Sequence, residues 1–487
     1  MPSGTMRFSR DDLVRELPAM TTAYDVRRAD WLIVFLATVY LMITRASVEY
    51  CFLILFGIAA GGIFAVRRMG LRKSIAILIF LVVVLGFINS RRSIRELRSV
   101  TIGSYSGIAT VISDPLNVGA ATRITLEIES DRFSVYAYGR PGWRLAGVKV
   151  GEQIFVSGQR EELEIDNQQW LIAEHIKGRF EVDTVGELRL PAAPLMRSVQ
   201  RVRDLVSQGA DSFEFADRTL FTGLVIGDDT RQPKSMIVAF RNSGLAHLVA
   251  VSGQNVALIL AVMSPLLSRL ARRPRMLVTL GILAWFVVIT RVEPSVVRAA
   301  MMAGLAFLSV AIGRPTRTMR LIALTVLIAV MVDPLLAWSV GFYMSVGATC
   351  GLCLGAGPLA RIIRGPKWLA QLIAATVAAQ IGVMPAVLLV FGLPSATGIV
   401  ANVLAVPVAG LVMLVGLPLA LISGLIVDAG FSGFAAVIMW PVQVGVRWVW
   451  WVAEIFARLK VDGVANIALW IGVFIAILLM RHRSSSV

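Results

Sequence analysis

The sequence predicts a mainly α-helical, polytopic membrane helix bundle with one small soluble β-barrel domain, of OB-like type, inserted between two helical blocks. Three observations support this fold class. Hydrophobic residues make up 57% of the chain and charged residues only 16%, against about 25% charged in soluble domains. Apolar residues occur in runs near the ~20 residues that cross a bilayer. Between about residues 101 and 185, apolar and polar residues instead alternate with a period of two, which is typical of half-buried strands.

Residues 1–98 are predicted to form an N-terminal membrane block with about three spans, Trp31–Ile43, Cys51–Val66 and Ser74–Asn89. No small-residue cleavage site follows the first run, which favours a retained span over a signal peptide. The loop 67–73 carries four basic residues. Basic loops stay in the cytoplasm, so the chain after the third span is expected outside.

Residues 99–190 are predicted to form the β domain. Ile124, Leu126 and Ile128 alternate with polar neighbours, and Phe133 and Val135 continue the pattern. Five short strands in this length suit a small OB-like barrel. The remaining strand candidates are Gly107–Ser113, Gln153–Ser157 and Gln169–His175.

OB folds often bind single-stranded nucleic acid through cations and stacking aromatics. Between Arg98 and Leu190, however, ten basic residues face thirteen acidic ones, and an acidic barrel is a poor binder of polyanions. Nucleic-acid binding and a spacer or assembly role both stay open for this domain. The net charge of +16 also has two explanations. It could serve nucleic-acid binding, or it could reflect topology, since basic residues collect in the cytoplasmic loops of membrane proteins whatever their function.

Residues 191–243 are predicted to be an amphipathic connector, whose part 195–216 could lie on the membrane surface. Residues 244–487 form the second membrane block. The basic loops 271–275, 314–320 and 361–367 alternate with loops that are not basic, which again places the β domain outside. The predicted runs are Gly244–Leu270, Met276–Thr290, Ser295–Gly313, Leu321–Val332, Leu335–Ala356, Trp368–Phe391, Ala396–Val427, Phe431–Ala457 and Ala465–Met480. Ala396–Val427 is too long for one upright helix and holds two prolines, which favours two shorter pieces.

A group of polar residues interrupts the first of these runs: His247, Ser252, Gly253 and Asn255. Polar groups at membrane depth usually face partners or a wet cavity, and Gly253 permits a break in the helix. These residues are candidates for a channel or substrate path, and helix-to-helix adhesion is the alternative. The same two readings apply to Arg298, Gln380 and Asn402, which interrupt later runs.

Several functional motifs are missing. The chain has no G-x-x-x-x-G-K-[ST] loop, and its histidines and cysteines form no zinc signature. Cys350 and Cys353 lie within an apolar run and are expected to be small core residues. We therefore expect no catalytic residues, no metal, no cofactor and no enzymatic activity.

The order of several motifs resembles that of the ComEC competence proteins. They are G-L-V-I-G-D-D and F-R-N-S-G-L-A-H-L-V-A-V-S-G-Q-N-V, followed by P-S-V-V-R-A-A-M-M-A, D-P-L-L-A-W-S-V-G-F-Y-M-S, A-Q-I-G-V-M-P and A-N-V-L-A-V-P-V. The motif residues of interest are Gly227, Asp228, Gly244, Pro294, Asp333, Pro334, Gly341, Phe342, Pro385 and Pro407. The likeness is strong over residues 220–407.

The resemblance implies a channel in the bacterial inner membrane that passes single-stranded DNA into the cytoplasm during natural transformation. It further implies a cytoplasmic DNA-translocating ATPase and a periplasmic DNA receptor as partners, beside membrane lipids, and leaves a homo-oligomer open. A permease or flippase for another anionic substrate is the alternative, and a scaffold whose β domain recruits partners is the third reading.

The sequence departs from the family in two places. Many members carry a histidine where this chain has Asn255, which puts a proton or metal role there in doubt. Many members also end in a metallo-β-lactamase-like domain, which is expected to be lacking after Val487. Any degradation of the second strand would then fall to another protein.

Overall fold

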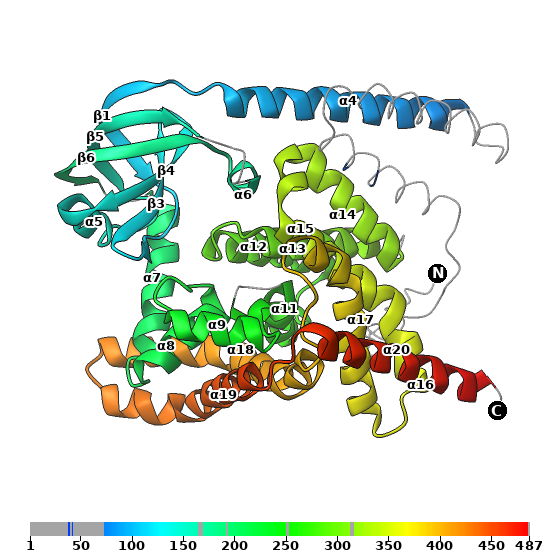
Figure 1. Ribbon diagram of the computed structural model, residues 1–487. Helices are drawn as coiled ribbons and strands as arrows, with labels where there is room; N and C mark the ends of the chain where they lie inside the picture. The colour runs from blue at the N-terminus through cyan, green and yellow to red at the C-terminus, as the bar shows by residue number, and fades with distance from the viewer. Residues whose placement is uncertain are drawn as a thin grey trace, which may run out of the picture.

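The computed structural model describes residues 38, 41, 73–163, 169–190, 193–249, 253–311 and 316–485. Nearly all of the first two predicted spans, and Ser252, lie outside these residues. The third predicted span lies within helix α4 (Lys73–Arg98), which runs along one edge of the molecule to the sheet domain (Figure 1). The side-chain amide of Asn89 donates to the carbonyl of Met331 at 2.8 Å, which ties α4 to helix α14 (Thr318–Val332).

The inserted domain is a sheet of six strands in the order β1-β5-β6-β4-β3-β2, with an additional pairing of β1 with β3. The strands β4 and β6 pair in parallel and the other pairs are antiparallel. The core includes Ile124, Leu126, Phe133 and Val135, all nearly fully buried, as the alternation predicts. The bounds are β1 (Gly103–Val111), β2 (Leu116–Val118), β3 (Ala121–Ile128), β4 (Asp131–Tyr138), β5 (Gln153–Glu162) and β6 (Ile176–Leu190).

One predicted strand is wrong. Gln169–His175 contains helix α6 (Gln169–Ala173), and β6 begins only at Ile176. Successive side chains of a strand point to opposite faces, whereas Leu171 and Ile172 are both buried, at 1% and 8% exposure. Two adjacent apolar residues on one buried side fit a helical turn better than a strand.

Three helices occupy the predicted connector: α7 (Pro194–Gly209), α8 (Phe215–Ile226) and α9 (Lys234–Asn242). Helix α7 packs directly on α18 (Gly398–Asp428). A Cβ at Gly209 would lie 2.2 Å from the carbonyl oxygen of Ala420, so only glycine permits this approach. Helix α8 is buried on all sides from Thr219 to Ile226, and the amphipathic description therefore does not fit it.

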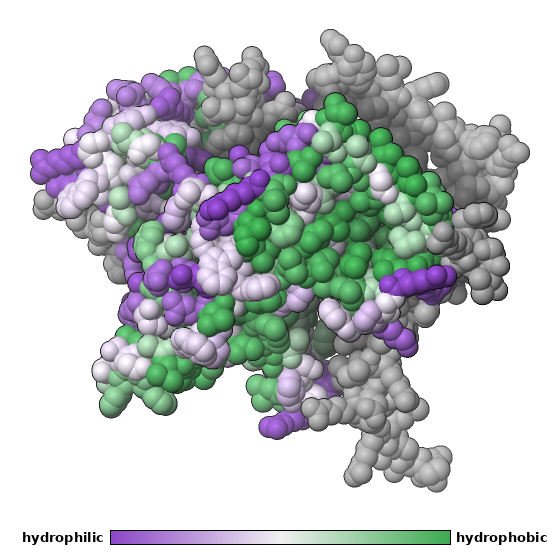
Figure 2. Space-filling view, turned by 60° about the horizontal axis from the view of Figure 1, so that its bottom comes forward, coloured by the Kyte–Doolittle hydropathy of each residue, from purple (hydrophilic) through white to green (hydrophobic). Residues whose placement is uncertain are grey.

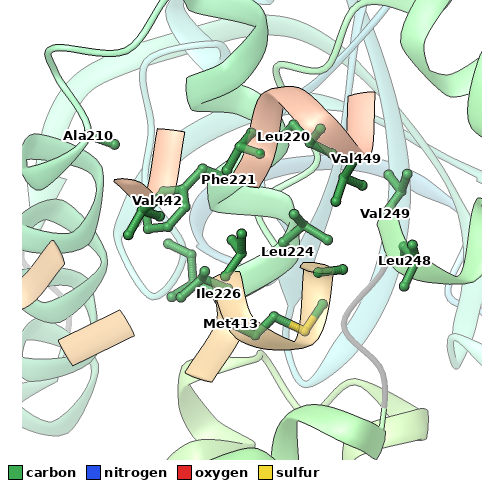
Figure 3. Packing of buried hydrophobic residues seen from close by; sticks show 14 of the residues in the cluster. Ala210, Leu220, Phe221, Leu224, Ile226, Leu248, Val249, Met413, Val442 and Val449 are labelled. Carbon is green, nitrogen blue, oxygen red and sulfur yellow. The ribbon is translucent and has the colours of Figure 1, made fainter. Parts of the chain in front are cut away.

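Helix α8 forms the centre of the largest core cluster (Figure 3). Phe221 and Leu224, which have no exposed surface, face Met413 of α18 and Val442 and Val449 of α19 (Ser432–Arg458). Truncating a buried phenylalanine costs about 3–5 kcal/mol, so α8 anchors the two longest helices to the rest of the bundle.

The remaining helices follow the predicted runs closely, and the first run is divided between α10 and α11. Their bounds are α10 (Ala246–Val249), α11 (Gly253–Leu267), α12 (Arg272–Ile289), α13 (Pro294–Ala311), η1 (Pro334–Trp338), α15 (Val340–Gly351), η2 (Leu352–Ala356), α16 (Gly357–Ile362), α17 (Lys367–Val390) and α20 (Gly463–Ser485). The expectation of two pieces over Ala396–Val427 is wrong. The helix α18 continues through Pro407 and Pro418, since neighbouring helices support a proline-containing helix in a bundle.

Within the described residues, five helices are long and apolar enough to cross a membrane: Val340–Ile362, Lys367–Val390, Gly398–Asp428, Ser432–Arg458 and Gly463–Arg481. Figure 2 shows a broad hydrophobic face on the bundle, bordered by hydrophilic residues. Residues such as Leu389 and Val464 are 86% and 83% exposed. Apolar surface of this extent needs lipid around it, which makes the chain a multi-pass membrane protein.

Candidate functional site

The G-L-V-I-G-D-D segment lies where helix α8 ends. Gly227 closes the helix in the left-handed conformation, with a φ of 70°, which glycine adopts without strain. The carboxylate of the next residue, Asp228, accepts a hydrogen bond from the hydroxyl of Thr230 at 2.7 Å. The segment is thus a helix cap that presents an acidic side chain.

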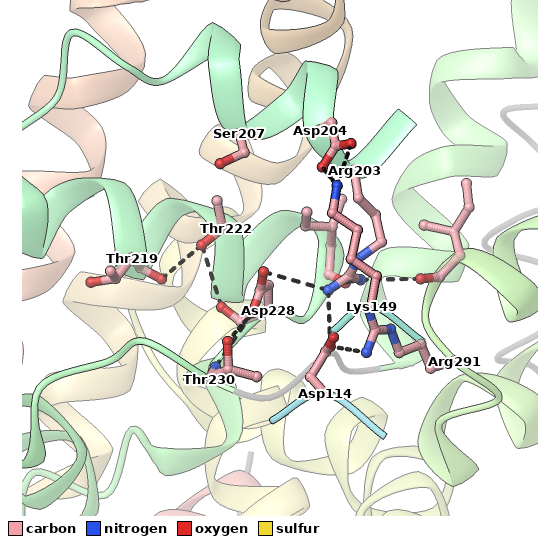
Figure 4. Close-up of polar contacts among 12 residues, drawn as sticks. Asp114, Lys149, Arg203, Asp204, Ser207, Thr219, Thr222, Asp228, Thr230 and Arg291 are labelled. Atoms are coloured by element: carbon pink, nitrogen blue, oxygen red, sulfur yellow. Dashed lines mark hydrogen bonds and ion pairs between the residues drawn. The ribbon is translucent and has the colours of Figure 1, made fainter. Parts of the chain in front are cut away.

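Arg203 of α7 connects this cap to the sheet domain (Figure 4). Its side chain is buried, and Nη1 donates to the carbonyl oxygens of Ile226 at 2.9 Å and Ile289 at 3.2 Å. Its Nη2 lies 3.6 Å from carboxylate oxygens of both Asp228 and Asp114. Asp114, which follows strand β1, also pairs with Arg291, just after α12.

Burial lowers the pKa of Arg291 to about 10 and shifts the pKa of Arg203 in the same direction. Both guanidinium groups stay charged at neutral pH. The network therefore joins the sheet domain, the end of α8 and the loop after α12 through fixed charges.

A second link to the sheet domain involves Asp333 and Pro334. Asp333 caps η1 by accepting from the backbone N–H of Leu335 at 3.0 Å, and Pro334 is the first residue of that helix. The other contact of Asp333 is His175 Nε2, at 3.1 Å. Burial lowers the pKa of His175 and raises the pKa of Asp333.

Arg298 and the residues Gly341 and Phe342 come from different sequence motifs but are in contact. The Arg298 guanidinium carbon lies 5.0 Å from the centre of the Phe342 ring, and Nη2 donates to the carbonyl of Gly341 at 3.1 Å. Arg298 is only 4% exposed, yet Nε and Nη1 have no hydrogen-bond partner among the described residues. Buried donors usually have a hydrogen-bond partner. The unbonded nitrogens of Arg298 are therefore free to donate to a bound anion.

The start of α11 lies between helices α8 and α13. The amide of Asn255 donates to the carbonyl of Leu224 at 3.0 Å, and its own oxygen is buried without a partner in the described residues. A Cβ at Gly253 would lie 3.0 Å from Ala299, next to Arg298. The His247 side chain, on α10, is exposed, and Ser252 lies outside the described residues.

Gly244, Gln380 and Asn402 gather around the start of α18. A Cβ at Gly244 would lie 3.1 Å from the Cα of Gly398, and Gln380 Nε2 would lie 3.6 Å from a Cβ on Gly398. The amide of Asn402 donates to the carbonyl of Gly398 at 2.7 Å, whereas the Gln380 side-chain oxygen is buried and unbonded within the described residues. Apart from His247 and Ser252, the predicted path residues thus form two groups, one on α11 and α13 and one on α17 and α18.

The predicted prolines have structural positions. Pro294 starts α13, where its missing N–H costs nothing. Pro385 lies inside α17 and Pro407 inside α18. A cavity of about 190 Å³ lies between α8, α11, α12 and α18, and Asn255 lines it among mostly apolar residues.

The comparisons with known proteins show the family of the chain. The family model described as "Competence protein" matches residues 224–483, more than half of the chain. The chain belongs to the competence protein family. ComE operon protein 3 of Bacillus subtilis (strain 168) is 25% identical over 245 residues, which are 50% of this chain and 31% of that protein. The chain thus matches less than a third of the length of this relative, and no solved structure matches significantly.

Sequence reasoning missed three residues of the site, Asp114, Arg203 and Gln232. The first two also precede the range matched by the competence family model, which begins at residue 224. Gln232 lies against Gly223, where its Nε2 would be 2.3 Å from a Cβ, and its side-chain oxygen is buried and unbonded among the described residues. The only signal in the sequence is that Arg203 is a charge on the apolar face of an amphipathic helix, at the spacing of Val199 and Val206.

Proposed function

We propose that this chain is a channel of the bacterial inner membrane that passes single-stranded DNA into the cytoplasm during natural transformation. Membership in the competence family supports a role in DNA uptake. The observation that carries the proposal is Arg298, a buried guanidinium with two nitrogens, Nε and Nη1, that have no hydrogen-bond partner among the described residues. It adjoins the first turn of α11, where Asn255 adds a buried, unbonded oxygen.

A polyanion needs hydrogen-bond donors such as the Arg298 guanidinium in order to leave water, whereas the Asn255 oxygen can only accept a hydrogen bond. A guanidinium binds phosphate with directed hydrogen bonds, and a side chain held over an aromatic ring keeps a fixed direction. Buried amides at Asn255, Gln380 and Asn402 would continue a polar seam through the bundle. We assign no catalytic step, cofactor or metal to this chain.

The sheet domain is proposed to be an OB-type barrel on the outer side of the membrane. The strand pairings support this, because they link β1, β3, β4, β6 and β5 in a ring. Within the ring, β4 and β6 are parallel. The domain carries a cation beside an aromatic ring, since Arg179 lies 5.6 Å from the ring centre of Tyr136, and it has two further exposed aromatics, Tyr138 and Trp143, at 61% and 79% exposure. Such a surface suits bases of a single strand, although the domain is acidic as a whole.

We further propose that residues 99–190 form this domain and that residues 244–487 form the channel domain. A cytoplasmic ATPase would supply the pulling force, because the sequence has no P-loop, and a periplasmic receptor would deliver the DNA. The alternative substrate is another anion carried by a permease or flippase, which the same Arg298 would also attract.

Deleting the gene in its own host and restoring it in single copy tests the proposal. Transformation by chromosomal DNA should be lost in the deletion and recovered with the restored gene. Undiminished transformation in a deletion strain with no second family copy would refute the DNA channel. A normal transformation frequency together with lost transport of another anion would favour the permease.

A further inference from the structure

The cavity of about 190 Å³ between α8, α11, α12 and α18 is almost entirely apolar. Of the polar seam, only Asn255 reaches it, and Trp285 is the other lining residue whose side chain carries a nitrogen or oxygen atom. An apolar cavity of about 150 Å³ stays dry and accepts a benzene molecule. The cavity beside Asn255 therefore has room for a single aromatic ring.

Asn255 gives the cavity wall an unpaired hydrogen-bond acceptor. Its side-chain nitrogen donates to the carbonyl of Leu224 at 3.0 Å, which fixes the orientation of the amide. Its side-chain oxygen is buried and has no partner among the described residues. A buried acceptor without a donor is costly, so a ligand that brings an O–H or N–H group to Asn255 gains affinity by removing this cost.

Pro418 leaves a second acceptor in the same wall. Proline has no backbone N–H, so the carbonyl of Leu414, four residues earlier in α18, lacks its usual helical donor. Leu414 and Pro418 both line the cavity. Among the described lining residues, the indole of Trp285, which is 40% exposed, supplies the only remaining side-chain donor. The wall thus favours a ligand that donates a hydrogen bond.

The apolar lining favours an aromatic ring as the body of this ligand. Phe286 and Trp285 contribute aromatic side chains, and rings attract one another in edge-to-face and offset arrangements. Met263 and Met413 contribute thioether sulfurs, which make favourable contacts with rings and adapt to their shape. These four side chains can surround a ring, while Asn255 receives the donor group that the ring carries.

We propose that this cavity binds a small phenol, a single aromatic ring with one hydroxyl group that donates to the side-chain oxygen of Asn255. The competing occupant is the acyl chain of a lipid, which has no donor at its apolar end and leaves Asn255 unpaired. The site goes beyond DNA uptake, and its test measures ligand binding instead of transformation, so the two proposals stand or fall separately.

Fluorine NMR titrations of the full chain in lipid nanodiscs with 4-fluorophenol and 4-fluorotoluene test the proposal. The probes differ only by a hydroxyl in place of a methyl group, so their comparison isolates the donor. The wild type should bind 4-fluorophenol. Asn255→Leu should lower the ratio of the 4-fluorophenol affinity to the 4-fluorotoluene affinity about tenfold, because the acceptor is lost. Binding of 4-fluorotoluene by this variant shows that its cavity is intact.

A filled cavity tests the location of the site. Val262→Trp places an indole in the α11 wall of the cavity and should abolish the binding of both probes. Ala261→Trp is the matched control, since Ala261 is exposed and does not line the cavity, and it should bind both probes as the wild type does. No saturable binding of 4-fluorophenol to the wild type, an unchanged affinity ratio in Asn255→Leu, or equal binding by the wild type and Val262→Trp would each overturn the proposal.

Discussion

The guanidinium of Arg298 lies over the ring of Phe342, 5.0 Å from its centre, and so links two motifs 44 residues apart in the sequence. The link fixes the direction of the two unbonded nitrogens of Arg298, Nε and Nη1. Replacing Arg298 by Gln should lower transformation at least tenfold, since the charge is lost. Replacing it by Lys should give an intermediate loss, because an ammonium lacks the planar fork. Membrane levels from an immunoblot separate these effects from misfolding.

The junction between the sheet domain and the helices is the network of Asp114, Arg203, Asp228 and Arg291. Arg203 is expected to stabilise this junction most. Replacing it by Met leaves Asp114 and Asp228 without their shared partner, and breaking a buried charge network costs about 3–5 kcal/mol. Thermal unfolding in detergent should show a clearly lower Tm. Arg201→Met is the control on the same helix, because Arg201 is 59% exposed and such pairs contribute about 1 kcal/mol or less. Equal shifts for both variants would contradict this role.

The close approach of α15 and α17 makes a third prediction. A Cβ at Gly382 would lie 2.1 Å from the carbonyl oxygen of Gly347, so Gly382→Ala must push the helices apart. Overpacking of this kind typically costs about 1–3 kcal/mol. Gly357→Ala, which has open space around it, should leave the Tm unchanged. An unchanged Tm for Gly382→Ala would show that the two helices are not packed this closely.

The acidic residues near the junction predict a pH dependence. The pKa of Asp229 is raised by burial first, and the pKa of Glu293 is raised by burial and by the charge of Asp229. A carboxyl whose pKa is higher in the folded state opposes folding once the pH exceeds its unfolded value, about 4. Replacing Asp229 by Asn should therefore raise the Tm more at pH 7.5 than at pH 4.

Unfolding of both forms at the two pH values checks this sign. Asp462→Asn, at a carboxylate that is 71% exposed, serves as the control and should show no such difference. A Tm gain for Asp229→Asn that is larger at pH 4 than at pH 7.5 would contradict the shifts.

The sequence predicts the helices and strands well where a single periodicity dominates. The alternation around Ile124 and Phe133 and the apolar runs of α17, α19 and α20 are examples. It fails at Gln169–His175, where adjacent apolar residues fold into a helical turn, and at α18, where the bundle supports two prolines. Local sequence patterns do not show where tertiary packing will stabilise a helix against such signals.

For the candidate site, the motifs predict which residues matter but not which of them meet. The contacts of Arg298 with Phe342 and of Gln380 with the Gly398 region join distant segments. Arg203 and Asp114 lie outside the motifs. Their role depends on the packing of the sheet domain against α7 and α8, which the sequence does not show. The cavity beside Asn255 likewise forms only where α8, α11, α12 and α18 meet.

The most direct test of the central claim is the amount of labelled DNA that enters the cytoplasm as a single strand, protected from external nuclease. The account predicts uptake in the host with the wild-type gene, none in the deletion strain, and at least a tenfold loss with Arg298→Gln at normal membrane levels. Equal cytoplasmic single-stranded DNA in the wild-type and deletion strains, with no second family copy present, would contradict it.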